Sequence, residues 1–190
     1  FTKCIFTMLR TFSTSIIVMT VLTKQVIKSE IEAGNITVKP QLEESQVGPA
    51  SIDLTLSNDF RVYKKLSEPV EICADYRDIT EPVFIADNEF IDLKPNEIVL
   101  GITREEISLA PSICGLLEGR SRFARLGLLV HFTASIMAPG IQNRQVLEIC
   151  NLSANVIRLR PGARICQFMF LRCEGEASYS GQFQNQKLHE

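Results

Sequence analysis

The feature that most restricts the fold of this 190-residue chain is a succession of short apolar runs between residues 51 and 171. Each run is about as long as a β-strand and is followed by proline, glycine or polar turn residues, a pattern typical of an all-β sandwich or barrel. We therefore expect a mainly β fold with few helices and a loop-rich excursion over residues 67–87. The predicted strands are residues 51–56, 60–63, 90–93, 97–103, 106–109, 113–118, 128–132, 145–151, 156–159 and 165–171.

Residues 23–33 are predicted to form an amphipathic helix that precedes the strands. Thr23 can cap its beginning and Gly34 can end it. Lysine and glutamate side chains occupy the polar face. The apolar stripe is formed by Val26, Ile27 and Ile31.

A second, short helix is predicted inside the segment 119–134, with Ser121 as its N-cap and Gly127 as its stop. Ser121 and Arg125 are four residues apart, so they project from the same helix face. Backbone N–H groups at a helix N-terminus favour an anion, and the segment therefore predicts a phosphate cradle. The alternative is a surface helix with solvated arginines. The side chains expected around the anion are Arg120, Ser121 and Arg122.

Glu148 is the strongest candidate for a catalytic side chain. On the strand predicted for residues 145–151 it shares one face with Val146 and Cys150, and both faces of that strand are apolar. Burial would raise the pKa of the carboxyl group toward the range useful for a general base. The alternative is a glutamate on a solvated edge or in a structural ion pair.

The composition excludes several classes of function. A formal net charge of −2 argues against a general nucleic-acid-binding surface, although it leaves room for a local cationic pocket. The best uncharged apolar stretch, residues 16–22, is far too short to span a membrane. The six cysteines form no C-x-x-C pair, which favours free thiols in a reducing compartment and a cytoplasmic protein.

Zinc-dependent hydrolysis of the kind that relies on His-x-Glu and Pro-Cys-x-x-Cys segments is also excluded. That mechanism needs a histidine or cysteine two residues before a glutamate, together with a Pro-Cys-x-x-Cys segment. The chain has only two histidines, His131 and His189, and no C-x-x-C segment. His131 is therefore predicted to be structural or to line a pocket, and no metal ligand is assigned.

Five segments carry a specific resemblance to a known family. Residues 119–127 followed by 131–134 resemble the central motif of dCTP deaminases, which belong to the dUTPase-like superfamily. The resemblance covers roughly residues 20 to 187, with the motifs in the family's order. It implies a dUTPase-like distorted jelly-roll or β-clip barrel with an N-terminal helix and a short central helix. The other matching segments are residues 49–56, the catalytic strand within 139–151, the hairpin 160–168 and the tail 179–186.

The resemblance implies that Glu148 activates a water for attack on the amino-bearing carbon of cytosine, while Ser121 and Arg125 position the water and the carboxylate. It also implies a homotrimer with shared active sites, with dCTP as substrate, dTTP as a feedback inhibitor, and Mg²⁺ bound with the triphosphate instead of in a protein cage. The substrate-binding residues that it implies are Arg120, Arg122, His131, Phe132, Thr133, Ala134, Gln167, Tyr179, Gln182 and Gln186.

The leading hypothesis is therefore zinc-independent deamination of dCTP to dUTP and ammonia, which supplies dUTP for thymidylate synthesis. Alternatives are a bifunctional dCTP deaminase and dUTP diphosphatase, a dUTPase, or a nucleotide-binding regulator without turnover. Three positions depart from the family pattern. Ala138 stands where relatives have an aspartate, Gln182 where many have a lysine, and Arg122 where a small hydroxyl residue is common.

The length suits a single domain, predicted over residues 19–190. Its tail, residues 173–190, is rich in Gly, Ser, Gln and Asn and is expected to be mobile without ligand. Residues 1–18 contain basic but no acidic residues, so they are interpreted as a leader, either translated upstream sequence or a segment that resembles a transit peptide.

Overall fold

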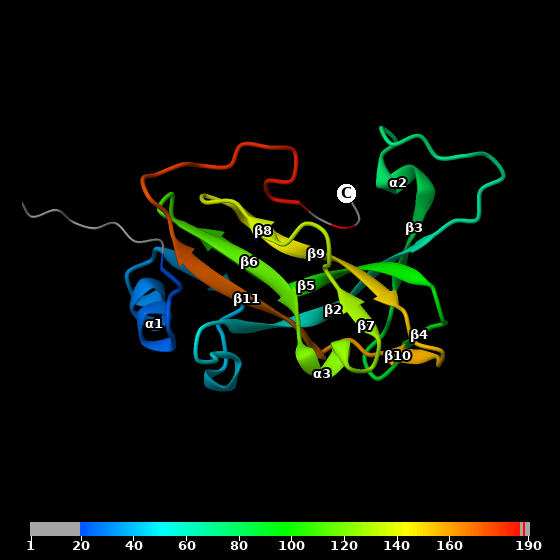
Figure 1. Cartoon of the computed structure of the whole chain (residues 1–190), viewed down its shortest axis with the longest axis horizontal. Helices are drawn as coiled ribbons and strands as arrows, with labels where there is room; N and C mark the ends of the chain where they lie inside the picture. The colour runs from blue at the N-terminus through cyan, green and yellow to red at the C-terminus, as the bar shows by residue number, and fades with distance from the viewer. Residues whose placement is uncertain (1–19, 187, 189–190) are drawn as a thin grey trace, which may run out of the picture.

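The computed structural model describes residues 20–186 and 188, so the predicted leader lies outside the described residues. Most of the chain forms one curled antiparallel sheet with the strand order β7-β9-β5-β2-β11-β6-β8, and β1 and β3 pair with β5 and β2 (Figure 1). The mainly β fold with few helices is confirmed. The strands are β1 Ile36–Lys39, β2 Ile52–Tyr63, β3 Thr80–Phe84, β4 Ile91–Leu93, β5 Ile98–Leu109, β6 Ile113–Gly119, β7 Leu128–Val130, β8 Ile136–Met137, β9 Gln142–Asn151, β10 Ile157–Leu159 and β11 Arg164–Arg172.

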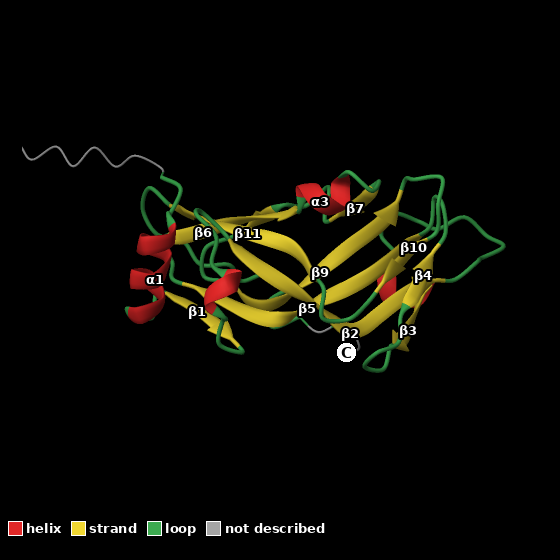
Figure 2. Ribbon diagram, turned by 90° about the horizontal axis from the view of Figure 1, so that it is seen from below, coloured by secondary structure: helices red, strands yellow, loops and turns green. Residues whose placement is uncertain are grey.

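The helices are short and lie at the margins of the sheet. They are α1 Lys24–Glu32, α2 Tyr76–Ile79 and α3 Ser121–Ala124, with a single 3-10 turn at Glu44–Gln46. Figure 2 shows α1 at one end of the curved sheet and the two-stranded β10–β4 sheet at the other.

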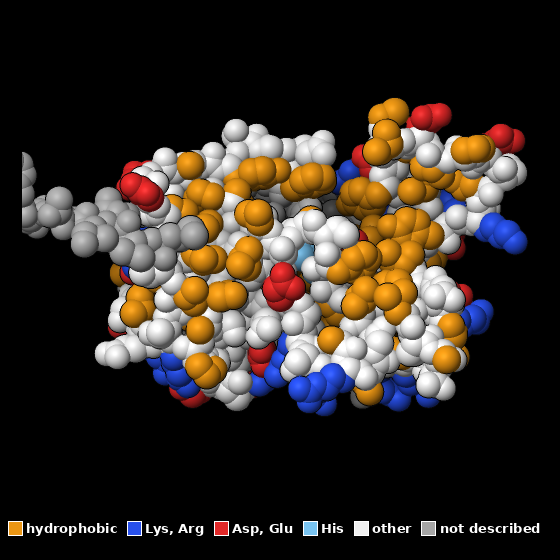
Figure 3. All heavy atoms as spheres, viewed as in Figure 1, with side chains coloured by type: hydrophobic (Ala, Val, Ile, Leu, Met, Phe, Trp, Pro, Cys, Tyr) orange, Lys and Arg blue, Asp and Glu red, His pale blue; other side chains and the backbone are white. Residues whose placement is uncertain are grey.

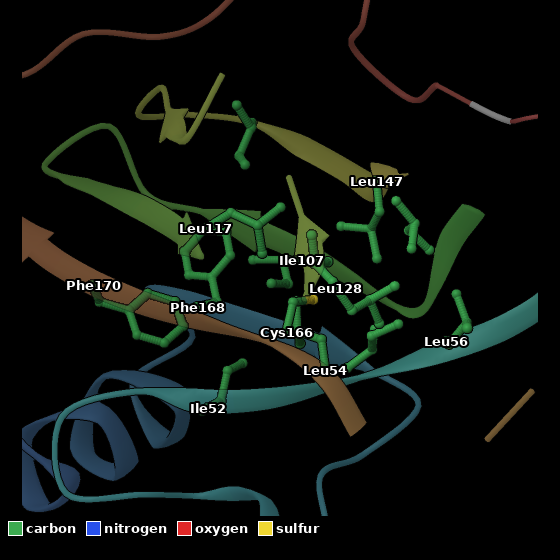
Figure 4. Close-up of a cluster of buried hydrophobic side chains, with 14 of the residues drawn as sticks. Ile52, Leu54, Leu56, Ile107, Leu117, Leu128, Leu147, Cys166, Phe168 and Phe170 are labelled. Atoms are coloured by element: carbon green, nitrogen blue, oxygen red, sulfur yellow. The ribbon is translucent and has the colours of Figure 1, made fainter. Parts of the chain in front are cut away.

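The core lies inside the curl of the sheet. Phe168 and Phe170 on β11 are fully buried, with ring centroids 4.9 Å apart. The ring of Phe168 lies against Gly115 on β6, where any Cβ would meet it at 2.1 Å, so a larger residue cannot pack there. Figure 4 shows side chains from β2, β5, β6, β7, β9 and β11 pointing toward one another in this cluster.

Two pairs of predicted strands are each one continuous strand. β2 covers the predicted 51–56 and 60–63, and β5 covers 97–103 and 106–109. The pairing register of β2 with β5 shifts between Leu56 and Phe60. Next to this shift, beyond the pair of Leu56 with Thr103, the buried Glu105 accepts a 2.7 Å hydrogen bond from the Thr55 backbone N–H and a 2.8 Å bond from Gln46. A buried carboxylate thus satisfies groups that the broken ladder leaves free, and the strands continue through the irregularity.

α1 agrees with its predicted range but not with every predicted contact. Thr23 is at the N-cap position, yet its side chain makes no capping hydrogen bond. Gly34 has φ +78° directly after the helix, as expected for a stop. Ile27 is fully buried, but Val26 is 37 % exposed, so its assignment to the apolar stripe is wrong. Val26 directly precedes Ile27, and successive helix residues are turned about 100° apart, so both cannot face the sheet.

The excursion predicted over residues 67–87 contains two regular elements. Asp75 caps α2 by accepting a hydrogen bond from the Arg77 backbone N–H. β3 follows directly and pairs with β2, from Thr80 opposite Tyr63 to Phe84 opposite Asp59. The prediction of a mostly irregular segment is therefore wrong for residues 76–84.

The turn from α3 into β7 places the functional segment. Gly127 has φ +83°, and a Cβ there would meet Ser153 at 2.8 Å, so the tight turn requires glycine. β7 then pairs with β9, with Val130 opposite Ile149. The next residue, His131, donates its backbone N–H to the Glu148 carbonyl over 2.8 Å. This pairing brings the side chains of His131 and Glu148 together.

Candidate active site

A cavity of about 370 Å³ lies beside β9 and is bordered by the segment 131–141 and the tail. Glu148 is the only carboxylate among the described residues that line it, and no lysine or arginine lines it. The remaining wall is apolar, aromatic or uncharged, including Tyr63, Met137, Ala138 and Phe183. The geometry therefore places one ionisable pair, His131 and Glu148, in a cavity large enough for a small ligand.

His131 and Glu148 face each other inside this cavity. His131 Nδ1 lies 3.0 Å from Glu148 Oε2, and their side chains are 6 % and 30 % exposed. The other ring nitrogen, Nε2, lies 2.9 Å from the Ala134 carbonyl oxygen. His131 has φ +53°, a left-handed backbone that is uncommon for residues other than glycine. Such strain is held by surrounding structure and is frequent at functional sites.

The electrostatics of the pair differ from the prediction for Glu148. Burial tends to raise its pKa, as expected, but His131 outweighs burial and holds the pKa of the Glu148 carboxyl below its ordinary value. Burial tends to lower the pKa of His131, and the hydrogen-bonding and charge of Glu148 overcome this and raise that pKa. The predicted upward shift for Glu148 is therefore wrong. The sequence did not show that a histidine lies beside the carboxylate.

Two amide side chains form a polar wall on β9. Gln145 Nε2 donates to Asn143 Oδ1 over 2.7 Å, and Asn143 Nδ2 donates to the Phe183 carbonyl over 3.1 Å. Gln145 and Asn143 are buried and both line the cavity. Gln145 is not among the residues predicted from the sequence. Its signal is the alternation of β9, which places Gln145 on the same buried face as Leu147 and Ile149, where its amide needs a partner.

The tail lies over the hairpin that precedes β9. The Tyr179 backbone N–H donates to the Pro139 carbonyl over 2.9 Å, and Gln186 Nε2 donates to the Arg144 carbonyl over 3.2 Å. Tyr179 and Gln186 line the cavity as predicted for tail residues, whereas Gln182 is exposed and does not line it. The expected mobility of the tail without ligand stays a prediction.

The α3 residues do not reach the cavity of their own chain. Ser121 is the first residue of α3, and Arg120 holds the N-cap position without a side-chain capping bond, so the predicted capping by Ser121 is wrong. Arg120 instead forms an ion pair with Asp53 at 3.1 Å. Ser121, Arg122 and Arg125 are exposed. In Figure 3 basic side chains gather beside α3, apart from the hydrophobic side chains over much of the same face.

The remaining predicted substrate-binding residues are divided between the cavity and its surroundings. Ala134 lines the cavity, while Phe132 and Thr133 are exposed beside it. Gln167 donates to the Gly119 carbonyl over 3.3 Å, which ties β11 to the turn before α3. One chain thus brings together the residues Glu148, His131, Ala134, Tyr179 and Gln186. It does not bring to them Ser121, Arg125, Arg120, Arg122, Phe132, Thr133, Gln167 or Gln182.

Within residues 20–186 and 188, no three His, Cys, Asp or Glu side chains gather in an arrangement that could hold a metal ion. In the same part of the chain, no helix combines the length and the apolar character needed to cross a membrane. Magnesium prefers oxygen ligands, and the one carboxylate of the cavity already faces His131. Within the described residues the cavity therefore offers no set of side chains that could hold Mg²⁺ without further ligands.

Comparison with known proteins identifies the family. A family model described as "dCTP deaminase-like" matches residues 21–173. The chain belongs to the dCTP deaminase-like family. A protein of Methanopyrus kandleri named "dCTP deaminase, dUMP-forming" is 39 % identical over 176 residues, covering 90 % of this chain and 91 % of the relative. A protein of Tolumonas auensis named "dCTP deaminase" is 37 % identical, covering 80 % and 83 %.

Solved structures agree with a dUTPase-like fold. The 2'-deoxycytidine 5'-triphosphate deaminase of Agrobacterium tumefaciens matches with a TM-score of 0.65 at 18 % identity, over 81 % of this chain and 48 % of the other. This chain thus spans about half the length of that structure. A mutant dUTPase from phage phi11 of S. aureus matches with a TM-score of 0.50 at 11 % identity, over 77 % and 96 %. The predicted fold and family are confirmed.

The match to the dCTP deaminase-like family covers one part of the candidate site and not the other. Residues 21–173 include α3, His131, Ala138 and Glu148. Tyr179, which lines the cavity from the tail, lies beyond the matched range, as do Gln182 and Gln186. In this member of the dCTP deaminase-like family the cavity wall carries the methyl group of Ala138, without a second carboxylate among the described residues.

Proposed function

We propose that the protein removes the amino group of dCTP by hydrolysis and releases ammonia. The observation that carries this proposal is Glu148, the single carboxylate among the described residues that line the cavity, whose pKa the neighbouring His131 holds below its ordinary value. An ionised carboxylate can accept a proton from water, so that the water attacks the amino-bearing carbon of cytosine. The membership in the dCTP deaminase-like family and the names of its relatives support dCTP as the substrate.

The proton balance of this reaction suits one carboxylate. Water adds its oxygen to the ring carbon, and its two hydrogens end on the ring nitrogen and on the leaving ammonia. Glu148 therefore has to take up a proton from water and pass it on, which an ionised carboxylate beside the reacting ring can do. No step requires zinc in this proposal. Mg²⁺ would be bound with the triphosphate and would neutralise part of its charge.

We further propose a homotrimer in which α3 of one copy completes the cavity of the next. Supporting this, Ser121 and Arg125 are exposed on α3 and do not line their own cavity. Large apolar side chains are also exposed on the same chain, including Leu126 at 59 % and Ile136 at 77 %. In such an assembly Ser121 and Arg125 would position the water and the carboxylate.

Arg120, Arg122, Tyr179, Gln182 and Gln186 would bind the triphosphate. The base would be bound by the segment Phe132, Thr133 and Ala134, near His131. Gln167 would act from β11, where it is hydrogen-bonded to Gly119 at the end of β6. We expect dTTP to bind the same site as a feedback inhibitor. The reaction would supply dUTP for thymidylate synthesis in the cytoplasm.

The proposed product is dUTP. Hydrolysis of the phosphate chain needs a group that orients a second water near the sugar and phosphates, and Ala138 offers only a methyl group at that wall. The second candidate is a bifunctional enzyme that releases dUMP, which the names of several relatives favour. Asn143 and Gln145, whose amides line the same cavity, are the groups that could serve it.

A time course with dCTP and Mg²⁺, with nucleotides separated by charge, tests both proposals. dCMP and dUTP serve as comparison substrates, and Glu148→Gln is the control variant. We expect dUTP and ammonia to accumulate in equal amounts and Glu148→Gln to lose about 10²-fold or more of the rate while still binding dCTP. Formation of dUMP at the rate of dCTP loss, without free dUTP, would establish the bifunctional alternative. If the wild-type protein binds dCTP but does not convert it, a nucleotide-binding regulator becomes the favoured function.

A further inference from the structure

The ring of His131 lies between two hydrogen-bond acceptors. Its Nε2 is 2.9 Å from the Ala134 carbonyl oxygen, and its Nδ1 is 3.0 Å from Glu148 Oε2. A carbonyl oxygen can only accept, so the favourable form of the first contact has the hydrogen on Nε2. A neutral imidazole has one N–H, and with that hydrogen on Nε2 the lone pair of Nδ1 points toward the carboxylate.

This arrangement is unfavourable unless a further proton is present. Nδ1 and Oε2 are both buried, and although they lie 3.0 Å apart, neither makes a hydrogen bond within the described residues. Two lone pairs facing each other at 3.0 Å would leave two buried acceptors unsatisfied, at a cost that folded proteins generally avoid. One proton between the two atoms satisfies both.

The backbone keeps the two side chains in this position. The His131 N–H donates to the Glu148 carbonyl over 2.8 Å, directly after the last β7–β9 pair. The left-handed backbone of His131 turns the chain so that Ala134 comes back to the ring. The register of the sheet and the turn therefore place the two side chains next to each other.

We propose that His131 and Glu148 share one proton in the resting enzyme, with His131 as the imidazolium that keeps Glu148 ionised and aimed at the cavity. His131 is then a positioning residue. Its deprotonation sets the upper pH limit of the reaction. This inference rests on the proposed role of Glu148 in deamination.

The groups around the pair agree with this charge state. Glu118 on β6 adds to the negative field at His131 and helps to raise its pKa. Burial raises the pKa of Tyr63 on β2, and the charge of Glu148 adds to that shift, so Tyr63 remains a neutral phenol near the pair. No lysine or arginine among the described residues lines the cavity, so within one chain His131 is the cationic side chain that faces Glu148.

The proton can be located without substrate, because the chain contains only two histidines. In a His189→Gln background of the full chain, the remaining histidine resonances belong to His131. Their chemical shifts are followed over a pH titration by NMR, in the presence and absence of Glu148→Gln. We expect His131 to titrate above the ordinary histidine range when Glu148 is present and at clearly lower pH in Glu148→Gln. Identical titrations in the two proteins would overturn the proposal.

A second variant separates the proton from the fold. His131→Asn keeps a side chain that tolerates φ +53° and can donate an amide hydrogen to Glu148, but it cannot carry a charge. We expect a folded protein with about 10²-fold lower kcat. The low-pH limit of its activity should move upward, because Glu148 loses its cation, and the high-pH limit that His131 sets should disappear. Unchanged limits would refute the positioning role.

The two measurements also separate this inference from the proposed function. If the pKa of His131 depends on Glu148 but the protein does not convert dCTP, the shared proton is supported and the deaminase proposal is refuted. If the protein converts dCTP but the pKa of His131 does not depend on Glu148, the deaminase proposal is supported and the shared proton is refuted.

Discussion

Glu105 offers the sharpest test of how β2 and β5 are held together. The side chain is 3 % exposed and accepts two hydrogen bonds, from the Thr55 backbone N–H at 2.7 Å and from Gln46 Nε2 at 2.8 Å. Glu105→Ala removes both acceptors. The Gln46 amide keeps its bond to the Asp53 carbonyl, whereas Glu105 is the acceptor that the structure gives the Thr55 N–H.

The expected cost follows from these contacts. A buried donor left unsatisfied costs about 1–3 kcal/mol, and hydrogen bonds to charged groups contribute about 1.5–3 kcal/mol. Glu105→Ala leaves the Thr55 N–H without an acceptor and removes one of the two acceptors of the Gln46 amide. It should therefore lower the free energy of unfolding by about 2–4 kcal/mol. Glu105→Gln keeps one acceptor oxygen, which can serve Thr55, and should cost about half as much.

Urea denaturation at one fixed protein concentration measures the difference, since assembly would make apparent stability depend on concentration. Glu106→Ala, at a half-buried neighbouring position on β5, is the matched control and should change stability by less than about 1 kcal/mol. A loss below about 1 kcal/mol for Glu105→Ala would mean that Thr55 and Gln46 find other partners and that Glu105 does not hold the irregularity.

Three further predictions concern the site. Arg120→Ala should raise the KM for dCTP far more than the KM for any residual activity on dCMP, because a guanidinium contact to phosphate contributes ~1.5–3 kcal/mol. Steady-state kinetics with both nucleotides measure this difference. Equal losses on the two nucleotides would mean that Arg120 serves only its ion pair with Asp53. A zinc-specific chelator with Mg²⁺ supplied should leave activity intact, and a loss reversed only by zinc would overturn the proposed mechanism. The contact between His131 and Glu148 should stabilise the fold most between pH 4.5 and 6.5, the ordinary pKa values of the two groups. The raised pKa of His131 gives stability that is lost as pH rises. The lowered pKa of Glu148 gives stability that is lost as pH falls. Denaturation of Glu148→Gln and wild type near pH 5.5 and pH 9 should therefore show the larger difference at the lower pH, and an equal difference would contradict the shared charge.

Local patterns predicted those parts of the fold that depend on nearby residues. α1 lies within residues 23–33 because its stripe and its glycine stop are local signals. The merging of two predicted strands into β5 was not predictable in this way, since Glu105 finds its partner Thr55 fifty residues earlier in the chain. β8 has only two residues, too few for any periodic pattern.

In the candidate site, too, local features could be predicted from the sequence and contacts between distant residues could not. Glu148 was identified from one strand, because alternation along β9 is local. Its contact with His131 depends on the pairing of β7 with β9, and a shift of one residue would turn the two side chains to opposite faces. The direction of the Glu148 pKa shift was therefore predicted wrongly from burial alone. Glu148 does line the cavity, and its catalytic role stays a prediction.

The charges of the cavity bear on how the proposed substrate is bound. A triphosphate needs cations or many N–H donors, yet no lysine or arginine among the described residues lines the cavity of one chain. The arginines of α3 are the nearest match in chemistry, and Arg122 and Arg125 are exposed there. An active site assembled from α3 of one copy and β9 of another would place both charge and carboxylate on a single nucleotide. Mixing Arg125→Ala chains with Glu148→Gln chains tests this, because hybrid assemblies would then contain some intact sites and recover part of the activity that neither variant has alone. Failure to recover activity in verified mixed assemblies would mean that each chain builds its site from its own residues, with the tail supplying the phosphate contacts.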